Sequence, residues 1–224
     1  MGSSSAFLST LRSSDLEALA ERWSVRSYRR NELIIEQRDE GRDVFFVLDG
    51  GVRVTLFSAG GREVAYRDLH PGDIFGELAA IDGKLRSASV IAIEATRAAQ
   101  LSAAAFEEMV REHPSFTWAL LSHLSGLLRR MTDRVFEFST LVVRERVVCE
   151  LLRRAEELGQ PQGGGETVIP LPRHFELAAT ISTHREAVSR EMSILAKRGL
   201  VERRGNRLVI KDRSALEALA GKDR

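Results

Sequence analysis

The stretch FGELAAIDGKLRS, residues 75–87, has a composition that neither a core strand nor a surface loop would share. Glu77 directly follows a glycine, Arg86 comes nine residues later, and most residues between them are apolar. Gly76 allows the backbone to approach a ligand closely. Glu77 can begin a short helical turn whose backbone N–H groups point at an anion, and Arg86 adds a forked cation that keeps its charge. The pattern predicts an anion site.

The carboxylate of Glu77 restricts which anionic ligands fit this site. A carboxylate repels a phosphate, so Glu77 fits such a site only if it accepts hydrogen bonds from a neighbouring hydroxyl, such as a ribose 2′-OH. A sugar fused to one phosphate would satisfy both Glu77 and Arg86. The alternative is that Glu77 and Arg86 pair with each other as an ion bridge across a turn, which an isolated pair at this spacing would favour.

Composition predicts a soluble, globular chain. It has 224 residues, of which 43% are hydrophobic and 29% charged, enough for one large domain or two small ones with cores of their own. No apolar run approaches the roughly 18 residues of a membrane span, and the start lacks the layout of a signal peptide. The single cysteine, Cys149, lies in an apolar helical run and is interpreted as a core thiol. We expect a cytoplasmic protein.

Charge is unevenly distributed along the chain. Residues 1–140 carry a net charge of −3, whereas residues 141–224 carry +4, and together these give the overall +1. An acidic front and a basic rear favour a nucleic-acid-binding rear half.

The front half reads as a β structure between helices. Residues 13–22 predict a short helix capped by Ser14 or Asp15. From residue 24 to residue 101, short β-rich runs alternate with glycine-containing turns about every ten residues, which predicts a barrel or sandwich of hairpins. The runs are ELIIE, DVFFVLDG, VRVTLFS, REVAYRDL, ASVIAIE and RAAQLS.

A long helix follows a short one at residues 103–112 and a break at His113–Pro114. Its apolar residues recur at alternating steps of three and four, a coiled-coil period that predicts a parallel homodimer. The alternative is a single helix packed on its own barrel. The seam comprises Leu121, Leu124, Leu128, Met131, Val135, Phe138 and Val142.

The rear half predicts a helix-turn-helix. A helix at 144–158 precedes a glycine-rich loop, a strand at 167–172, helices at 173–181 and 183–199, and a hairpin around residues 204–206. The second helix must enter the major groove. Its charged face would carry Arg185, Glu186, Ser189 and Arg190, and its inner face Met192, Leu195 and Ala196. The alternative is a solvated helix with a Glu186–Arg190 ion pair.

The segment HPGDIFGELAAIDGKLRSASV, residues 70–90, closely resembles the phosphate-binding cassette of cyclic-nucleotide-binding domains, and VLDGGVRV, residues 47–54, resembles their second hairpin. The resemblance covers roughly residues 5–140. It implies that Glu77 takes the ribose 2′-OH, that Thr132 contacts the base and that Tyr66 and Arg67 line its pocket. Met131 departs from the two-hydroxyl version of the base site, so cyclic AMP is expected and cyclic GMP stays open. The phosphate would be held by Gly76, Leu78, Ala79, Arg86 and Ser87.

The segment ELAATISTHREAVSREMSILAKRGLVE, residues 176–202, resembles the winged helix of the cyclic-AMP receptor protein and fumarate–nitrate regulator (Crp/Fnr) superfamily. The resemblance implies a TGTGA-like half-site, read by Arg185, Glu186 and Arg190 with Ser189 on the same face. Arg173 and Thr183 would contact phosphates, and Arg203, Arg204 and Arg207 would lie on the wing. The family's turn glycine is replaced around Ser182, which should cost a little strain.

The two resemblances together imply one α+β architecture. Residues 1–112 would form a cyclic-nucleotide-binding, jelly-roll-like β-roll, residues 113–140 a dimerisation helix with a hinge at 137–140, and residues 141–224 a winged helix-turn-helix. The implied protein is a homodimeric transcription regulator with cyclic AMP or cyclic GMP as effector and double-stranded DNA and RNA polymerase as partners. No metal, membrane or enzymatic activity is expected.

Three other functions stay open. A relative with the same scaffold could sense another effector or none. One cysteine excludes an iron–sulfur cluster, and His70, His113 and His123 follow no haem-ligand pattern. An enzyme on a cupin-like barrel would need clustered metal ligands, whereas the five histidines are scattered. A nucleotide-binding regulatory subunit that does not bind DNA would not need the basic rear half.

Overall fold

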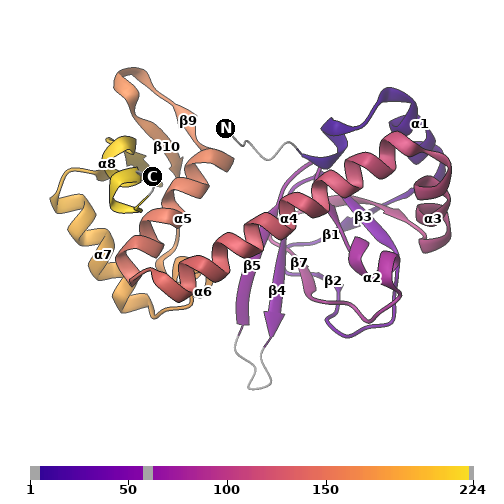
Figure 1. Ribbon diagram of the computed structural model, residues 1–224, viewed down its shortest axis with the longest axis horizontal. Helices are drawn as coiled ribbons and strands as arrows, with labels where there is room; N and C mark the ends of the chain where they lie inside the picture. Colours follow the sequence, from indigo (N-terminus) through magenta and orange to yellow (C-terminus); the bar gives the residue numbers. More distant parts are fainter. Residues whose placement is uncertain (1–5, 58–62, 222–224) are drawn as a thin grey trace. The chain divides into compact units, whose positions relative to one another are not determined.

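The computed structural model of the chain describes residues 6–57 and 63–221 (Figure 1). The residues form two compact units that divide between Arg129 and Arg130, inside one long helix. Each unit has its own hydrophobic core.

The N-terminal unit is built on two four-stranded antiparallel sheets, ordered β1-β8-β3-β6 and β2-β7-β4-β5. This arrangement confirms the expected jelly-roll-like β structure with flanking helices. Its elements are η1 (Phe7–Thr10), α1 (Ser13–Arg22), β1 (Ser24–Tyr28), β2 (Leu33–Ile35), β3 (Val44–Asp49), β4 (Val52–Phe57), β5 (Glu63–Leu69), β6 (Ile74–Phe75), α2 (Glu77–Asp82), β7 (Ser89–Ala92), β8 (Thr96–Leu101) and α3 (Ala103–Glu112).

Strand β3 is buried on both of its faces. Because neighbouring side chains of a strand point to opposite faces, Phe45 and Val47 join the cluster shared with Phe75 and Val90. Phe46 instead packs with Phe7 and other residues of the helical side. Each buried phenylalanine contributes about 1.5–3 kcal/mol relative to an exposed one. Strand β3 therefore ties the sheets to the helices, and Phe75, at the end of β6, leads directly into the cassette.

The expected cap of α1 was wrong. Arg12 is the N-cap residue, and no side chain caps the helix. Asp15 is buried and accepts a hydrogen bond of 2.7 Å from the Ser115 hydroxyl. Its carboxylate ties α1 to the start of the long helix instead of closing the first turn.

Helix α4 (Pro114–Thr140) is the long helix of the chain (Figure 1). It runs without interruption through residues 137–140, the segment expected to be a hinge, where the Thr140 hydroxyl donates to the carbonyl of Phe136 at 2.8 Å. The chain leaves the helix at Leu141. Val142 caps the next helix, so it does not belong to the α4 seam as the heptad pattern predicted.

The C-terminal unit confirms the winged helix-turn-helix. Its sheet has the order β11-β12-β10-β9, and the core below it includes Leu152, Leu177, Val188 and Leu208. The elements are α5 (Val143–Leu158), β9 (Gln160–Pro161), η2 (Gly163–Gly165), β10 (Thr167–Pro170), α6 (His174–Thr180), α7 (Arg185–Lys197), β11 (Val201–Arg204), β12 (Arg207–Ile210) and α8 (Arg213–Leu219).

Two details of this unit differ from the sequence-based expectation. Helix α8 was not anticipated, although Asp212 caps it by accepting from the backbone N–H of Ala215 at 2.9 Å. On α7 the buried apolar side chains are Val188, Met192 and Leu195, while Ala196 is exposed. With 100° between successive residues, Ala196 falls at the edge of this arc, and Val188 lies at its centre.

Among the residues that the structure describes, no helix is both long and apolar enough to cross a bilayer.

Candidate functional site

The cassette is a strand-to-helix turn around Gly76. Strand β6 ends at Phe75, whose ring stacks on Phe45 with centroids 5.1 Å apart. Gly76 has φ +83°, and α2 begins at Glu77, as the sequence predicted. The backbone N–H groups of Leu78 and Ala79 therefore lie in the first turn, where the helix itself offers them no acceptor.

Arg86 is buried, with 5% of its surface exposed, and backbone oxygens hold its guanidinium. Nη1 donates to the carbonyl of Gly76 and Nη2 to the carbonyl of Asp43, both at 2.7 Å. Among the described residues no carboxylate lies within 4.0 Å of these nitrogens. The alternative of a Glu77–Arg86 ion pair was therefore wrong, and the charge of Arg86 is not neutralised by direct contact.

Gly76 leaves room for this guanidinium. A Cβ atom at residue 76 would lie 2.8 Å from Arg86 Nη1 and 3.0 Å from the carbonyl oxygen of Asp43. Only glycine therefore fits the turn, because of both its positive φ and the approach of the arginine.

The two charged groups of the cassette titrate abnormally. Burial raises the pKa of Glu77, while its own backbone N–H, Arg67 and Arg86 act in the opposite direction. Burial lowers the pKa of Arg86, opposed by Asp43, Asp39 and Glu77. Both charges are thus poorly solvated, and a ligand that carries a phosphate and a hydroxyl would stabilise both of them.

The other residues expected in this site differ in accessibility. Leu78 and Ser87 are exposed, and Ala79 is buried. Arg67 is half-buried, and its Nη2 lies 3.7 Å from Asp73. The side chain of Tyr66 lies outside the described residues. Thr132 is exposed on α4 and belongs to the C-terminal unit, so its place in the nucleotide site stays a prediction.

The outer face of α7 carries the residues expected to read DNA. Arg185, Glu186 and Arg190 are exposed. No ion pair joins Glu186 to Arg190 in the described chain, because Arg190 Nε lies 3.5 Å from Glu191 instead. Glu191 is buried and is fixed by Arg144 at 2.8 Å. The alternative of a solvated Glu186–Arg190 pair is therefore not what the helix forms.

The turn before α7 contains the substitution noted in the sequence. Ser182 has φ 52°, the left-handed conformation that glycine adopts without strain. The Thr183 backbone N–H donates to the carbonyl of Ala178 at 2.9 Å, and Arg173 is the exposed N-cap residue of α6. A serine thus retains the turn that places α7 after α6.

Sequence reasoning missed His174, the first residue of α6. Its Nδ1 lies 2.7 Å from the hydroxyl of Ser189 on α7. On the wing, Arg204 pairs with Glu166 and Glu202, whereas Arg203 and Arg207 have no carboxylate partner within the described part of the chain. Of the three arginines expected on the wing, only Arg203 and Arg207 are unpaired.

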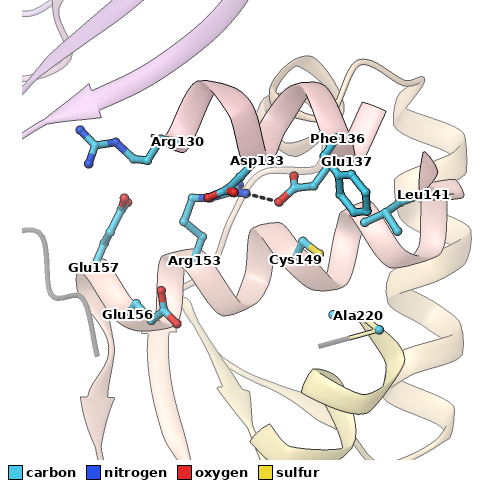
Figure 2. A pocket seen from close by; sticks show the side chains of 11 residues that line it. Arg130, Asp133, Phe136, Glu137, Leu141, Cys149, Arg153, Glu156, Glu157 and Ala220 are labelled. Carbon is cyan, nitrogen blue, oxygen red and sulfur yellow. Dashed lines mark hydrogen bonds and ion pairs between the residues drawn. The ribbon is translucent and has the colours of Figure 1, made fainter. Parts of the chain in front are cut away.

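A cavity of about 390 Å³ opens in the C-terminal unit beside α4, α5 and the end of α8 (Figure 2). Two of its charged lining residues are engaged with each other, since Arg153 bonds Glu137 at 2.7 Å. Burial would lower the pKa of Arg153, but Glu150 and Glu137 more than reverse this, so its pKa lies above the usual value. This balance of charge indicates a structural wall.

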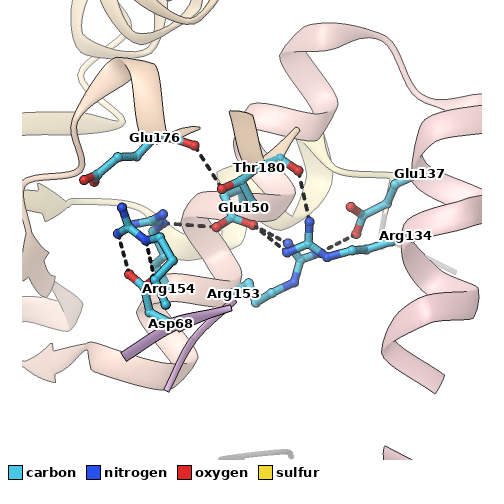
Figure 3. Close-up of polar contacts among 9 residues, drawn as sticks. Asp68, Arg134, Glu137, Glu150, Arg153, Arg154, Glu176 and Thr180 are labelled. Carbon is cyan, nitrogen blue, oxygen red and sulfur yellow. Dashed lines mark hydrogen bonds and ion pairs between the residues drawn. The ribbon is translucent and has the colours of Figure 1, made fainter. Parts of the chain in front are cut away.

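The same side chains belong to a larger ion network (Figure 3). Glu150, only 4% exposed, contacts Arg153, Arg154 at 3.1 Å and Arg134 at 3.7 Å. Arg134 also donates to the carbonyl of Thr180 at 3.0 Å. The network fixes the last turns of α4 to α5 and α6.

Comparisons with known proteins agree with both halves of this description. Residues 25–113 match the cyclic nucleotide-binding domain family, and residues 145–219 match the Crp-like helix-turn-helix domain. The cyclic AMP receptor protein of Thermus thermophilus is 32% identical over 197 residues, which cover 87% of each chain. A CRP-like cAMP-activated global transcriptional regulator of Mycobacterium tuberculosis is 26% identical over 203 residues, which cover 91% of each chain.

Among solved structures, a variant of CooA from Carboxydothermus hydrogenoformans superimposes with a TM-score of 0.79 at 24% identity, covering 91% of this chain and 90% of that one. At this identity the likeness shows the fold alone. The domains and the site together define a DNA-binding transcriptional regulator with a cyclic nucleotide-binding domain. The chain belongs to the Crp/Fnr superfamily of transcription regulators.

Proposed function

We propose that the cassette binds a 3′,5′-cyclic nucleotide, cyclic AMP or cyclic GMP, as the effector of this regulator. The observation that carries the proposal is Arg86, a buried cation held by two carbonyl oxygens with no carboxylate in contact. A cyclic phosphate would supply the missing negative charge, with Gly76, Leu78, Ala79 and Ser87 around it. Glu77 would accept the ribose 2′-OH, and Thr132 would contact the base.

Calorimetric titration of nucleotide-stripped protein with cyclic AMP and then cyclic GMP tests this assignment. We expect saturable binding of about one nucleotide per chain, with loss of binding in Arg86→Leu. Arg22→Leu is the matched control, because Arg22 is a half-buried arginine of the same unit that pairs with Glu108 at 3.3 Å. Absence of heat with either nucleotide in folded protein would contradict the effector and leave DNA binding in place.

The second half of the proposal is a two-fold, TGTGA-like DNA site. Arg185 can fork onto guanine, Glu186 can accept from cytosine, and Arg190 and Ser189 share their helix face. Arg173 and Thr183 would contact phosphates, with Arg203 and Arg207 on the wing. In Arg185→Ala we expect about 5- to 150-fold weaker DNA binding, from about 1–3 kcal/mol per bidentate contact. Nucleotide binding should be unchanged, and loss of both activities would contradict the division of labour.

The homodimer rests on the exposed apolar side chains of α4. Leu121, Leu128 and Val135 are 51%, 69% and 65% exposed, at the steps of seven that a coiled-coil seam requires. Two copies related by a two-fold axis would place their α7 helices about 34 Å apart, one turn of DNA. Light scattering should give twice the chain mass for the wild type and one chain mass for Leu128→Asp.

Gating then requires that the nucleotide bind one arrangement of the two α4 helices more tightly than the other. The hinge at residues 137–140 and the contact with RNA polymerase belong to the same proposal. We also propose that the regulator is cytoplasmic and has no enzymatic activity. The test is DNA affinity with and without saturating nucleotide, which should differ in the wild type and be equal in Arg86→Leu.

A further inference from the structure

His174 lies where three elements of the C-terminal unit converge. It is the first residue of α6, and its Nδ1 contacts the Ser189 hydroxyl of the recognition helix α7 at 2.7 Å. The opposite ring nitrogen, Nε2, has no hydrogen-bond partner among the described residues. The ring is half-buried, and the protein holds it by its Nδ1 edge.

The two charges that shift the pKa of this ring are both positive. Burial lowers the pKa of His174 most, followed by Arg185 from α7 and Arg203 from β11, and no carboxylate opposes them. Both arginines lack an acidic partner within the described chain. On its own element, exposed Arg173 precedes the ring and Glu176 follows two residues later. A half-buried imidazole that feels the charge of two arginines, neither of them paired with a carboxylate in the described chain, is suited to an anion.

We propose that His174 binds a phosphate of the DNA backbone through Nε2, and that it takes up a proton when DNA binds. The inference rests on the proposed DNA binding and adds a contact and a pH dependence to it. Ser189 supports the ring in both charge states. Its hydroxyl donates to Nδ1 of the neutral ring, which leaves the proton on Nε2, and it accepts from Nδ1–H when the ring is charged. Protonation converts the Nε2–H contact with the phosphate into a charge-assisted one, about twice as strong.

The direction of the pH dependence follows from linkage. In the free protein burial, and after it the two arginines, disfavour the imidazolium, so the ring is mostly neutral at neutral pH. Bound DNA brings negatively charged phosphates next to the ring, which raises the pKa of His174 in the complex. Affinity should therefore increase as pH falls through the bound-state pKa and level off below the free-state pKa. Each unit of difference between the two pKa values gives about tenfold in affinity.

The test is the dissociation constant for DNA between pH 8 and pH 6 at fixed ionic strength and saturating cyclic nucleotide. The probes are a duplex with two TGTGA half-sites and a random-sequence duplex, because a phosphate contact is independent of sequence. We expect both duplexes to bind wild type about three- to tenfold more tightly at pH 6 than at pH 8. His174→Gln should lose this difference. His184→Gln, which changes the exposed N-cap residue of α7, should keep it.

A second measurement separates a phosphate contact from a purely structural role. The chain has five histidines, so NMR titration of imidazole-labelled protein can follow each ring with and without DNA. The pKa of His174 should rise on binding. A pKa that stays constant, or a pH effect that persists in His174→Gln, would overturn the inference while DNA binding stands. Absence of DNA binding at every pH would overturn the DNA-binding function and the inference together.

Discussion

Both units hold arginines that are at least half-buried, but the partners of these arginines differ. In the N-terminal unit Arg86 is held by the carbonyls of Gly76 and Asp43, and neighbouring Glu77 forms no ion pair in the described chain. In the C-terminal unit Arg134, Arg153 and Arg154 converge on Glu150, and Glu137 pairs with Arg153 as well (Figure 3).

The difference distinguishes a binding site from a structural cluster. We call the cluster of Glu150 with Arg134, Arg153, Arg154 and Glu137 the clamp. A buried cation without a carboxylate partner is an uncompensated charge, which an anionic ligand would stabilise. In the Glu150 network the cations are paired with carboxylates of the protein itself, one of them buried, so the network fixes one arrangement of helices and needs no ligand. We therefore infer a ligand site at the Arg86 cassette and none at the cavity beside Arg153.

The largest effect on stability should come from removing the shared carboxylate of the clamp. Glu150→Leu leaves Arg134, Arg153 and Arg154 without their shared carboxylate. Loss of one side of a buried ion pair destabilises by about 3–5 kcal/mol. Both tryptophans, Trp23 and Trp118, lie in the N-terminal unit. Urea unfolding followed by far-ultraviolet circular dichroism should therefore shift, while unfolding followed by tryptophan fluorescence should not.

The matched control is Glu156→Leu, which removes an exposed carboxylate of the same helix that pairs with Arg213 at 3.0 Å. Exposed pairs contribute about 0–1 kcal/mol, so this variant should unfold nearly as the wild type does. Equal stability of the two variants would contradict the clamp.

The next effect should come from displacing Arg86 without removing it. Gly76→Ala places a methyl group 2.8 Å from Nη1, so the guanidinium must move. Charge-assisted hydrogen bonds contribute about 1.5–3 kcal/mol, so nucleotide affinity should fall about 10- to 150-fold. Gly83→Ala is the control, because it has φ +69° but an added Cβ would meet only Arg42, at 3.7 Å. If both variants lost affinity equally, backbone strain and not Arg86 would be the cause.

The cassette was predictable only in part, because some of the groups that contact Arg86 lie far from it in the sequence. Gly76, Glu77 and Arg86 fall within eleven residues, so their residue types alone indicate the chemistry. The carbonyl of Asp43 comes from 43 residues away, on the approach to β3. No local pattern could have revealed that backbone oxygens, and not Glu77, hold the guanidinium.

The clamp and the His174–Ser189 contact were not predicted for the same reason. The contacts that join different helices, Arg153 with Glu137, Arg134 with Thr180 and His174 with Ser189, span 15 to 46 residues and form only when α4, α5, α6 and α7 pack. The pairs of Glu150 with Arg153 and Arg154 are local, because they lie three and four residues apart on α5. Period and residue type predicted the helices themselves. They failed at Val142, where the apolar heptad continues beyond the end of α4, and at Ala196, which lies beyond the edge of the buried face of α7. Helix α8 had a local signal in its capping Asp212, which was overlooked.

A smaller effect should come from Glu77. Because burial raises its pKa, the folded protein without ligand binds this proton more tightly than the unfolded chain does. That stabilisation is present below the unfolded-state pKa and is lost as pH rises through the folded-state pKa. Glu77→Gln should therefore match the wild type at low pH. At pH 7 it should be more stable by about 1–2 kcal/mol, or about 2–4 °C in Tm per kcal/mol.

The same substitution should weaken nucleotide binding, because a glutamine oxygen is a poorer acceptor for the ribose hydroxyl than a carboxylate. Thermal melts followed by tryptophan fluorescence, beside calorimetric titration, measure both quantities. A variant that is less stable at pH 7 would show that Glu77 is satisfied within the protein, and the contrast with Glu150 would disappear.

The smallest effect should come from the turn before α7. Ser182 and Gly76 both have positive φ, but at Ser182 the conformation accompanies a turn and no buried charge. Ser182→Gly relieves left-handed strain of about 1–2 kcal/mol and loses about 0.4–1 kcal/mol through greater freedom of the unfolded chain. We expect a net gain of at most about 1.5 kcal/mol by circular dichroism, with the fluorescence transition unchanged. Ser193→Gly, inside α7, should destabilise by up to about 1 kcal/mol. A loss of stability in Ser182→Gly would mean that the serine stabilises the turn, and that positive φ outside the cassette carries no strain.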